Sequence, residues 1–249
     1  MNISFIVLSF NDSGTLKPLI YGLNDVLSKV SDDYEIIVID DCSHDGSFDL
    51  LKSIKEIDKL IVFQNSTNLN VGGSFQRAVS VAKYEYIGYT DGDHQYEPED
   101  LFSYKEYIGS YDVITGFRVS RKDSFKRRIY SKVFNFLAQQ FFRLNLQDVN
   151  SALKIFNGAK LKSLIHWDSG AFYDLEILMR LKFDLNASIK EIPITHRKRQ
   201  FGTAGGFSKR NLINIITNMI DPKFDQYRHR SLLTIFLKKI LRISFTIIT

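Results

Sequence analysis

The sequence predicts an α/β protein built on a mostly parallel, doubly wound sheet, followed by amphipathic helices at the C-terminal end. Two observations lead to this prediction. Short apolar runs alternate with patterns of helical period through the first half of the chain, and acidic residues directly follow two of those runs. The chain has 249 residues, of which 44% are hydrophobic and 24% are charged, so we expect one large domain with a substantial core.

Strand and helix signals alternate in a regular order up to about residue 90. Such alternation is typical of parallel strands with helices on both faces of the sheet. Ligands bind these sheets at the carboxyl ends of the strands, where Asp40, Asp41 and Asp91 are expected. The strand-like runs are residues 3–8, 35–39, 60–63 and 86–89, and the helical patterns between them are residues 14–30, 50–57 and 72–82.

The alternation stops after about residue 116, and helical patterns take over. Residues 125–142 form one such stretch, and its apolar side chains recur at helical spacing. We expect one face of this helix to be buried, with Tyr130, Phe134, Leu137 and Phe141 on it.

Residues 232–248 have a wide apolar face at helical spacing, with basic side chains opposite. A basic amphipathic helix of this kind lies in a membrane interface or packs on a second subunit. No run is long enough to cross a membrane. We therefore expect residues 1–210 to form the main domain, and residues 211–249 to form helices that bind a membrane surface or support a homo-oligomer.

The formal charge of +5 is concentrated in three basic segments, residues 117–145, 197–210 and 228–242. Nucleic acid, anionic lipid or a phosphorylated ligand are the partners that such segments attract. Broad apolar faces between the basic residues, and acids at the strand ends, disfavour nucleic acid. The only cysteine, Cys42, excludes an intrachain disulfide and fits a reducing compartment. No signal peptide is visible, so we expect a cytoplasmic protein.

Two carboxylates separated by one residue, Asp91 and Asp93, follow the strand-like run at residues 86–89. Paired carboxylates bind a hard divalent cation such as Mg²⁺ or Mn²⁺, and Gln95 adds a neutral oxygen ligand. Gly92 is expected to permit the sharp backbone turn that brings both side chains together. An ordinary Asp-Gly turn without a metal is the alternative.

Two other strand ends also carry polar residues. Asp40 and Asp41 have the chemistry to accept hydrogen bonds from a base or a ribose, although a helix cap would account for one acid of this segment. Ser43 or Asp45 is expected to cap the helix that follows. Residues 70–73, Asn-Val-Gly-Gly, open a helix whose free amides suit a phosphate or another polar ligand.

Taken in order, these motifs resemble the GT-A fold of glycosyltransferase family 2, over roughly residues 2–210. The dolichol-phosphate mannose synthases and bacterial polyprenyl-phosphate glycosyltransferases form the most similar branch. The chain departs from the family at Asp12, where Glu is usual, and at Ala204 and Gly205, where that branch has Ser-Lys. The resemblance is carried by residues 9–12 (SFND), 40–46 (DDCSHDG), 70–72 (NVG), 91–99 (DGDHQYEPE), 116–118 (GFR), 148–151 (DVNS), 191–194 (EIPI) and 196–202 (HRKRQFG).

The resemblance implies a metal-dependent, inverting glycosyltransferase that moves a sugar from a UDP- or GDP-sugar to a polyprenyl phosphate. It implies peripheral binding at the inner face of the membrane. The implied cofactor is Mg²⁺ or Mn²⁺, held by Asp91, Asp93 and Gln95. The other implied donor contacts are Ser9, Asn11, Asp12, Asp40, Asp41, Asn70, Gly72, Gly92 and Arg199. The implied contacts of the acceptor phosphate are Arg118, Arg128, Ser131 and Arg199.

The nature of the acceptor depends on charge and on a base. A phosphate acceptor is already ionised near neutral pH and needs positive charge, which the basic, aromatic-rich chain after residue 116 supplies. A sugar hydroxyl in cell-surface polysaccharide or lipopolysaccharide is the alternative acceptor, and it needs a carboxylate base. Asp174 and Glu176 are the base candidates, because hydroxyl-acceptor relatives place a Glu-Asp base nearby. A structural ion pair with Arg180 is the alternative role of Glu176.

Two other classes of protein share part of this pattern. A nucleotidyltransferase would have a Gly-rich phosphate loop after the first strand, and residues 9–14 do not form one. A non-catalytic nucleotide-sugar-binding protein would keep its ligand after Asp91 and Asp93 are both replaced by Ala. An enzyme would lose turnover instead.

Overall fold

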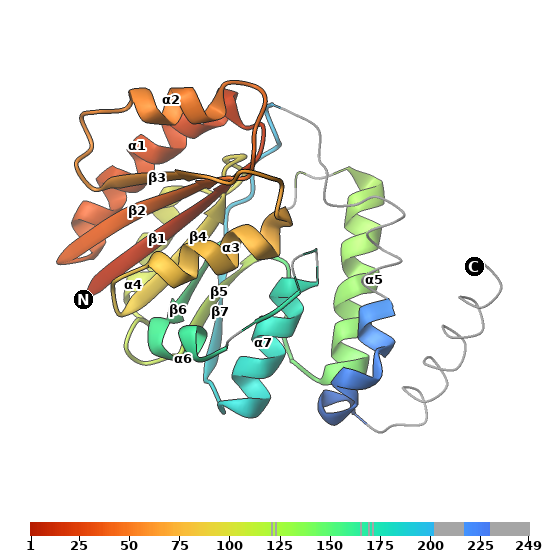
Figure 1. The fold of residues 1–249 in the computed structure, drawn as a ribbon. Helices are drawn as coiled ribbons and strands as arrows, with labels where there is room; N and C mark the ends of the chain where they lie inside the picture. Colours follow the sequence, from red (N-terminus) through yellow and green to blue (C-terminus); the bar gives the residue numbers. More distant parts are fainter. Residues whose placement is uncertain are drawn as a thin grey trace.

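The computed structural model describes residues 1–229, apart from positions 121, 123, 165, 169, 171 and 202–216. Seven strands form one sheet in the order β3-β2-β1-β4-β6-β5-β7 (Figure 1). Strand β6 runs antiparallel to both of its neighbours, and the other four pairings are parallel. The strands are β1 Asn2–Ser9, β2 Asp33–Asp40, β3 Leu60–Gln64, β4 Tyr86–Asp91, β5 Val113–Arg118, β6 Lys154–Asn157 and β7 Ile189–Ile194.

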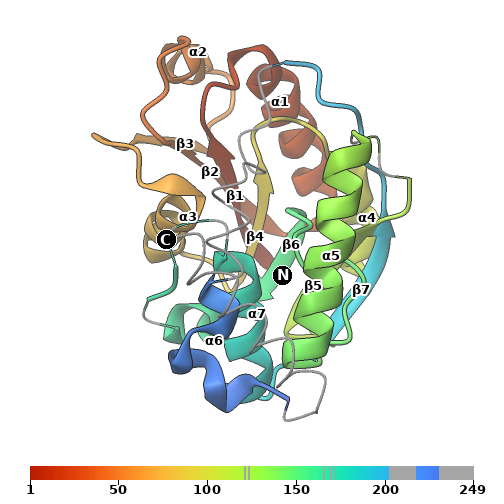
Figure 2. The ribbon, with the colours of Figure 1, turned by 90° about the vertical axis from the view of Figure 1, so that its right-hand side faces the viewer.

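Helices cover both faces of this sheet. On one face α1 packs against α4, and on the other α3 and α7 both contact α6 (Figure 2). Helix α5 stands beyond the carboxyl ends of the strands (Figure 1). The helices are α1 Ser13–Val30, α2 Ser47–Ser53, α3 Asn70–Val81, α4 Leu101–Lys105, α5 Phe125–Phe142, α6 Gly158–Ser163 and α7 Tyr173–Asp184, with short 3₁₀ turns η1 Pro98–Asp100 and η2 Pro222–Tyr227.

The hydrophobic pattern of the sequence explains why these elements form. Strand β1 is buried from its second residue onwards, as an apolar run between two helical layers requires. In α1, the buried side chains of Leu16, Leu19, Ile20 and Leu23 recur at three- and four-residue spacing and make one face. The predicted fold class, mixed α/β with a mostly parallel sheet, is confirmed.

Some elements differ from their prediction. Strands β5, β6 and β7 were not predicted, because each is short and they interrupt a region of helical pattern. Helix α2 begins at Ser47 rather than residue 50, where Asp45 Oδ1 accepts the Ser47 N–H (3.0 Å), and it ends before Ile54, which is extended. In α5, Tyr130 is 37% exposed, whereas the other three residues of the predicted face are buried.

Residues 232–248 lie outside the described residues, and so does the expected boundary at residue 210. Their predicted roles therefore stay predictions. In the part of the chain that the structure describes, no helix combines the length and the apolar character needed to cross a membrane.

Candidate active site

The carboxyl ends of the first four strands carry loops with strained backbone. Ser9 of β1 lies beside Asp40 of β2, and Leu8 lies beside Asp91 of β4. A non-glycine residue with positive φ costs on the order of 1 kcal/mol or more, and such residues gather at functional sites. This edge of the sheet is therefore the candidate active site. Each of the four loops contains one such residue: Asn11 (55°), Cys42 (65°), Asn70 (60°) and His94 (51°).

Gly92 lets the carboxylate of Asp12 approach the turn at residues 91–93. The turn itself is fixed by hydrogen bonds, because the Gly92 N–H donates to the Leu8 carbonyl (2.7 Å) and Thr15 Oγ1 donates to the Gly92 carbonyl (2.7 Å). A Cβ at position 92 would lie 3.0 Å from Asp12 Oδ2, so a side chain there would push this carboxylate away. The expected turn is present at Gly92, and the positive φ beside it falls at His94.

Carboxylates crowd this turn. Burial raises the pKa of Asp12 to about 6, and removal from water raises the pKa of Asp91 to about 7. The nearby charges of Asp93 and Asp174 add to the rise in the pKa of Asp91, and the charge of Arg199 opposes it. A further positive charge at this turn would lower both raised pKa values and keep both acids ionised.

We expect replacement of Asp91 by Asn to stabilise the protein more at pH 8 than at pH 5. Because the pKa of Asp91 is raised from 3.8 to about 7, the folded state binds its proton more tightly than the unfolded chain does. The free energy of unfolding therefore falls as the pH rises from about 4 to 7. Asn removes this loss, so its stabilising effect should be larger at pH 8 by about 2–3 kcal/mol.

Urea unfolding of the wild type and of Asp91→Asn at both pH values measures this difference. Asp49→Asn is the matched control, because Asp49 is exposed on α2. A stabilisation by Asp91→Asn that is equal at the two pH values would contradict the prediction.

Arg199 binds Asp93 from the segment that follows β7. Its Nη2 lies 2.7 Å from Asp93 Oδ2. Two hydrogen bonds fix this segment to the turn: Gln95 Nε2 donates to the Arg197 carbonyl (3.0 Å), and the Arg197 N–H donates to the Gln95 carbonyl (2.8 Å). Because the amide nitrogen of Gln95 is used in this way, its Oε1 is the atom that remains to act as a neutral ligand.

Asp91, Asp93 and Gln95 fit a hard divalent cation by the chemistry of their oxygen atoms. Mg²⁺ and Mn²⁺ prefer such oxygens, and Mg²⁺ is commonly bound by one or two carboxylates together with substrate phosphates. Among the described residues, no group of three or more His, Cys, Asp or Glu could hold a metal ion on its own. Water or a bound phosphate would complete the coordination.

Ser9 and Asp40 keep unused hydrogen-bonding capacity at the ends of β1 and β2. Both side chains are buried, and within the described part of the chain neither Ser9 Oγ nor Asp40 Oδ1 has a partner. Asp40 Oδ2 accepts from the Ser43 N–H and from Gln64 Nε2, each at 3.1 Å. Each of these two strand ends therefore holds one buried polar atom whose hydrogen bond is not made within the described residues.

Asn11 and Asp41 hold the loops of this edge together. Asn11 Oδ1 accepts the His44 N–H (2.9 Å), which links the loop after β1 to the loop after β2. Asp41 Oδ1 accepts the Leu69 N–H (2.8 Å) just before α3. Both side chains thus have a structural role in addition to any contact with a ligand.

More of the backbone hydrogen-bonding groups at the start of α3 have partners than the glycine pair in the sequence suggested. The Asn70 N–H donates to Asn68 Oδ1 (3.0 Å). The Gly72 carbonyl accepts from the buried indole Nε1 of Trp167 (2.9 Å). Because the Asn70 N–H is used, one fewer free amide is left here for a phosphate.

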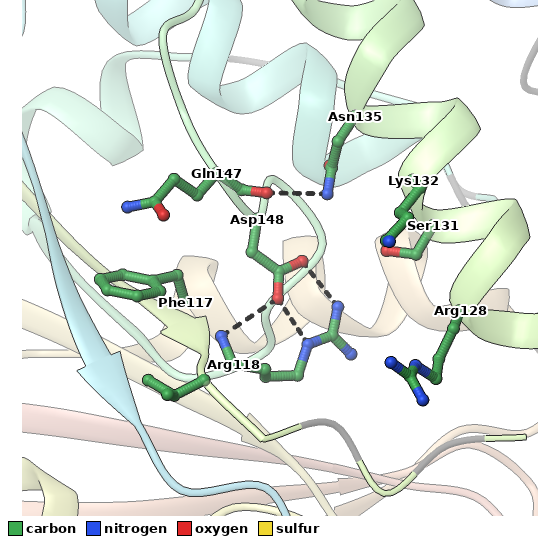
Figure 3. A pocket seen from close by; sticks show the side chains of 9 residues that line it. Phe117, Arg118, Arg128, Ser131, Lys132, Asn135, Gln147 and Asp148 are labelled. Atoms are coloured by element: carbon green, nitrogen blue, oxygen red, sulfur yellow. Dashed lines mark hydrogen bonds and ion pairs between the residues drawn. The ribbon is translucent and has the colours of Figure 1, made fainter. Parts of the chain in front are cut away.

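A cavity of about 270 Å³ lies between the carboxyl end of β5 and helix α5 (Figure 3). Arg118 lines it, and both oxygens of Asp148 bind its guanidinium (Nε–Oδ2 2.6 Å, Nη2–Oδ1 2.7 Å). Because Asp148 neutralises Arg118, the net positive charge comes from Arg128 and Lys132 of α5, for which no acidic partner is found among the described residues. The remaining lining residues are Phe117, Val119, Ser131, Asn135 and Gln147.

The loop at residues 148–152 lies between this cavity and the turn at residues 91–93. It precedes β6, which lies between β4 and β5 in the sheet and runs antiparallel to both. Asp148 at its start contacts Arg118, and the Ala152 N–H at its end donates to Tyr96 Oη (3.1 Å). The cavity and the acidic turn are therefore neighbours at one edge of the sheet.

Asp174, the first base candidate on α7, is part of a buried network. Its Oδ1 accepts from Tyr89 Oη (2.6 Å) and pairs with Lys154 Nζ (3.0 Å). Tyr173 Oη lies 3.2 Å from Tyr89 Oη in the same network. Burial raises the pKa of Tyr89 well above its usual value, so the phenol keeps its proton and donates a hydrogen bond to Asp174. The negative charge of Asp174 is thus matched by a buried ammonium group.

Glu176, the second base candidate, also has partners within the protein. Its Oε2 accepts the Asp168 N–H (2.9 Å), and its Oε1 lies 3.6 Å from Arg180 Nη1. The ion pair with Arg180 that the sequence offered as the structural alternative is therefore present.

Sequence reasoning assigned no role to Lys132, Asp148 or Lys154. Lys132 has a local signal, since it lies four residues after Arg128 and so on the same side of the helix. Lys154 has one too, because a lysine within the apolar run at residues 152–156 must find an acid if that run is buried. The pairing of Asp148 with Arg118 has no local signal, because the two lie 30 positions apart in the chain.

Comparison with known proteins identifies relatives of this chain. A family model described as glycosyl transferase family 2 matches residues 4–165. The undecaprenyl-phosphate 4-deoxy-4-formamido-L-arabinose transferase of Aeromonas hydrophila is 25% identical over 222 residues, which are 88% of this chain and 66% of that protein. The protein of the same name from Pectobacterium carotovorum is 25% identical over 226 residues, with the same coverage. This chain thus spans just under two thirds of the length of these relatives.

Solved structures share the fold at lower identity. Staphylococcus aureus TarS 1–349 in complex with UDP-GlcNAc has a TM-score of 0.62 and 20% identity, over 88% of this chain and 66% of that one. The glucosyl-3-phosphoglycerate synthase of Mycobacterium tuberculosis, in complex with Mn²⁺, UDP and glucosyl-3-phosphoglycerate, has a TM-score of 0.64 and 16% identity, over 89% and 81%. These likenesses confirm the expected GT-A fold.

Proposed function

Because this chain belongs to glycosyl transferase family 2, we propose that it moves a sugar from a UDP- or GDP-sugar to a polyprenyl phosphate at a membrane surface, with inversion and with a divalent cation. The enzyme class, a glycosyltransferase, follows from the family. The single observation that carries the choice of acceptor is the cavity beside the acidic turn, with its two cations from α5. An acceptor phosphate in this cavity would lie next to a donor held at residues 91–93.

The chemistry of the acidic turn supports a nucleotide-sugar donor. Asp91, Asp93 and Gln95 would hold Mg²⁺ or Mn²⁺, and the cation would stabilise the departing nucleoside diphosphate. A structure with this fold contains Mn²⁺ together with UDP, and another contains UDP-GlcNAc. Arg199 is paired with Asp93, and its guanidinium is the proposed contact of the diphosphate.

The unused atoms of Ser9 and Asp40 are the proposed contacts of the nucleoside, and Asp12 approaches the same turn. Asn11, Asp41, Asn70 and Gly72 would then shape the donor site mainly through the loops that they hold. Apart from Gly92, this proposal keeps the donor residues implied by the resemblance and divides them by role.

The partners of Asp174 and Glu176 weigh against a sugar hydroxyl as acceptor. A general base must be available to take a proton from the acceptor. Lys154 and Tyr89 both hold Asp174 through Oδ1, and Arg180 and the Asp168 N–H hold Glu176. We therefore propose that both acids have a structural role. A phosphate acceptor is consistent with this assignment because it is already ionised near neutral pH.

The proposal is tested by transfer from radiolabelled UDP- and GDP-sugars to short-chain polyprenyl phosphate, with Mn²⁺ or Mg²⁺ present. The expected result is a chloroform-soluble product that requires the metal. Donor binding without any lipid product would contradict the acceptor and redirect the test to glycan hydroxyls. Donor binding without turnover on either kind of acceptor would indicate a non-catalytic binding protein.

We expect Arg128→Ala and Lys132→Ala each to raise the KM for the lipid phosphate by about 10- to 100-fold. A hydrogen bond to a charged group contributes about 1.5–3 kcal/mol, and each variant removes one cation from the cavity. The KM for the nucleotide-sugar should stay within a few-fold of the wild type. Initial rates at varied acceptor and donor concentrations separate the two constants.

Lys105→Ala is the matched control for this prediction, since Lys105 is an exposed lysine on α4, which Figure 1 shows well away from α5. Equal changes in both KM values, or no change in the acceptor KM, would show that the cavity does not bind the acceptor phosphate.

A further inference from the structure

Helix α5 has two apolar sides, and the described part of the chain covers only one of them. Phe134, Ala138 and Phe141 on the inner side are buried against the rest of the domain. Four large apolar residues face the solvent on the other side, at spacings of four, four and three residues along the helix. These four residues, here called the outer stripe, are Phe125 (74% exposed), Ile129 (43%), Val133 (42%) and Phe136 (52%).

The outer stripe is continuous over more than three turns of the helix, so it is a patch rather than a scatter of single exposed residues. Figure 2 shows α5 running along the side of the molecule that faces the viewer. Val119, 64% exposed, adds a further apolar side chain just before the helix. Contiguous apolar surface of this kind marks a site that binds a protein or a membrane.

The charges beside the outer stripe favour an anionic partner. Arg128 and Lys132 are both exposed, and on the helix surface they lie directly beside Ile129 and Phe136. Helix α5 contains no acidic residue. A second copy of this chain that packed helix on helix would bring two such cationic rows together without any acid on either helix to pair with them. An anionic lipid surface offers both apolar depth and negative charge.

We propose that the outer stripe of α5 docks onto an anionic lipid bilayer, with Arg128 and Lys132 at the level of the lipid phosphates. The same two cations line the cavity, so this orientation turns the cavity toward the membrane surface. The side chains of the outer stripe then occupy the boundary between headgroups and acyl chains. The biological purpose of this docking, access to a lipid-linked acceptor, rests on the proposed function, but the docking itself does not.

The experiment is flotation of the full chain with vesicles, without donor or acceptor. Vesicles of phosphatidylcholine with phosphatidylglycerol are compared with pure phosphatidylcholine at low salt. We expect the wild type to float with the anionic vesicles only. Phe125→Glu/Phe136→Glu should lose at least about tenfold in the bound fraction, because two exposed aromatic rings that would enter the bilayer become charged. Val81→Glu/Phe102→Glu is the matched control, since both residues are 44% exposed and lie on α3 and α4.

Three outcomes would overturn the proposal. They are flotation of the outer-stripe variant equal to that of the wild type, failure of the wild type to float, and equal losses in the control variant. A wild-type dimer that becomes a monomer in Phe125→Glu/Phe136→Glu, seen by light scattering, would assign the stripe to a second copy instead.

A second measurement separates this proposal from the proposed function. An uncharged outer-stripe variant, Phe125→Ser/Phe136→Ser, is used here, because Glu at position 136 would pair with Lys132 one turn away. It should turn over a water-soluble short-chain acceptor at the wild-type rate, because neither changed residue lines the cavity. It should be slow only with a long-chain acceptor embedded in vesicles. Absence of turnover in the wild type together with normal flotation would contradict the proposed function and leave the docking surface intact.

Discussion

Replacement of Asp93 by Ala is expected to lower sugar transfer by on the order of 10³-fold, the largest catalytic effect of any single change in this chain. Asp93 is buried at the acidic turn and pairs with Arg199 through Oδ2 at 2.7 Å. The variant would lose a proposed metal ligand, and it would also lose the ion pair that orients Arg199. Both losses act on the diphosphate, whose departure is the step that needs stabilising.

Glu99→Ala is the matched control, because Glu99 is an exposed acid six residues further along the chain, in η1. Its transfer rate should equal that of the wild type. Circular dichroism and thermal unfolding show whether each variant is folded. A folded Asp93→Ala protein that keeps its transfer rate within tenfold of the wild type would remove Asp93 from the reaction and would favour the interpretation of residues 91–93 as an ordinary turn.

The positions of the acids at the candidate site were predictable because they depend on local rules. An apolar run of strand length is buried, its carboxyl end meets those of its parallel neighbours, and Asp40 and Asp91 follow two such runs. The exact reason for Gly92 was not predictable. It depends on the approach of Asp12, which is distant in the chain.

Partners separated by many residues could not be derived from the sequence. The pairs Arg118–Asp148 and Lys154–Asp174 form only when β5, β6 and α7 assemble, and strands β5 and β6 are too short to be recognised by period alone. The predicted phosphate-binding role of Arg118 therefore has to be considered with its carboxylate partner. In this region the sequence analysis identified candidate residues such as Arg118 and Asp174, but not the residues with which they pair.

Helix α5 illustrates a limit of hydrophobic pattern. Its bounds, residues 125–142, were predicted correctly, yet aromatic and aliphatic residues occur on more than one side. The pattern alone does not decide which side meets the core. The structure buries Phe134 and Phe141 and leaves Phe125 and Phe136 in solvent, and it also turns the predicted core residue Tyr130 partly outward.

Replacement of Lys154 by Met is expected to lower the free energy of unfolding by about 3–5 kcal/mol, because it leaves the buried carboxylate of Asp174 without its cation. The lysine is fully buried, and its ammonium group also contacts Tyr89 Oη (3.2 Å) and the Ser151 carbonyl. Urea unfolding at constant pH measures the loss. The double variant Lys154→Met/Asp174→Asn should recover much of it, since the amide introduced at position 174 carries no charge and its oxygen still accepts from Tyr89.

The same double variant decides the role of Asp174 in the reaction. Loss of a general base lowers the rate by about 10²- to 10⁴-fold. If Asp174 is structural, the folded double variant keeps its rate of transfer to lipid phosphate within tenfold of the wild type, and Asp174→Asn alone behaves in the same way. A folded double variant that is stable but loses activity by 10²-fold or more would make Asp174 the base. The acceptor would then be a hydroxyl, since a phosphate that is already ionised gains little from a base at this position.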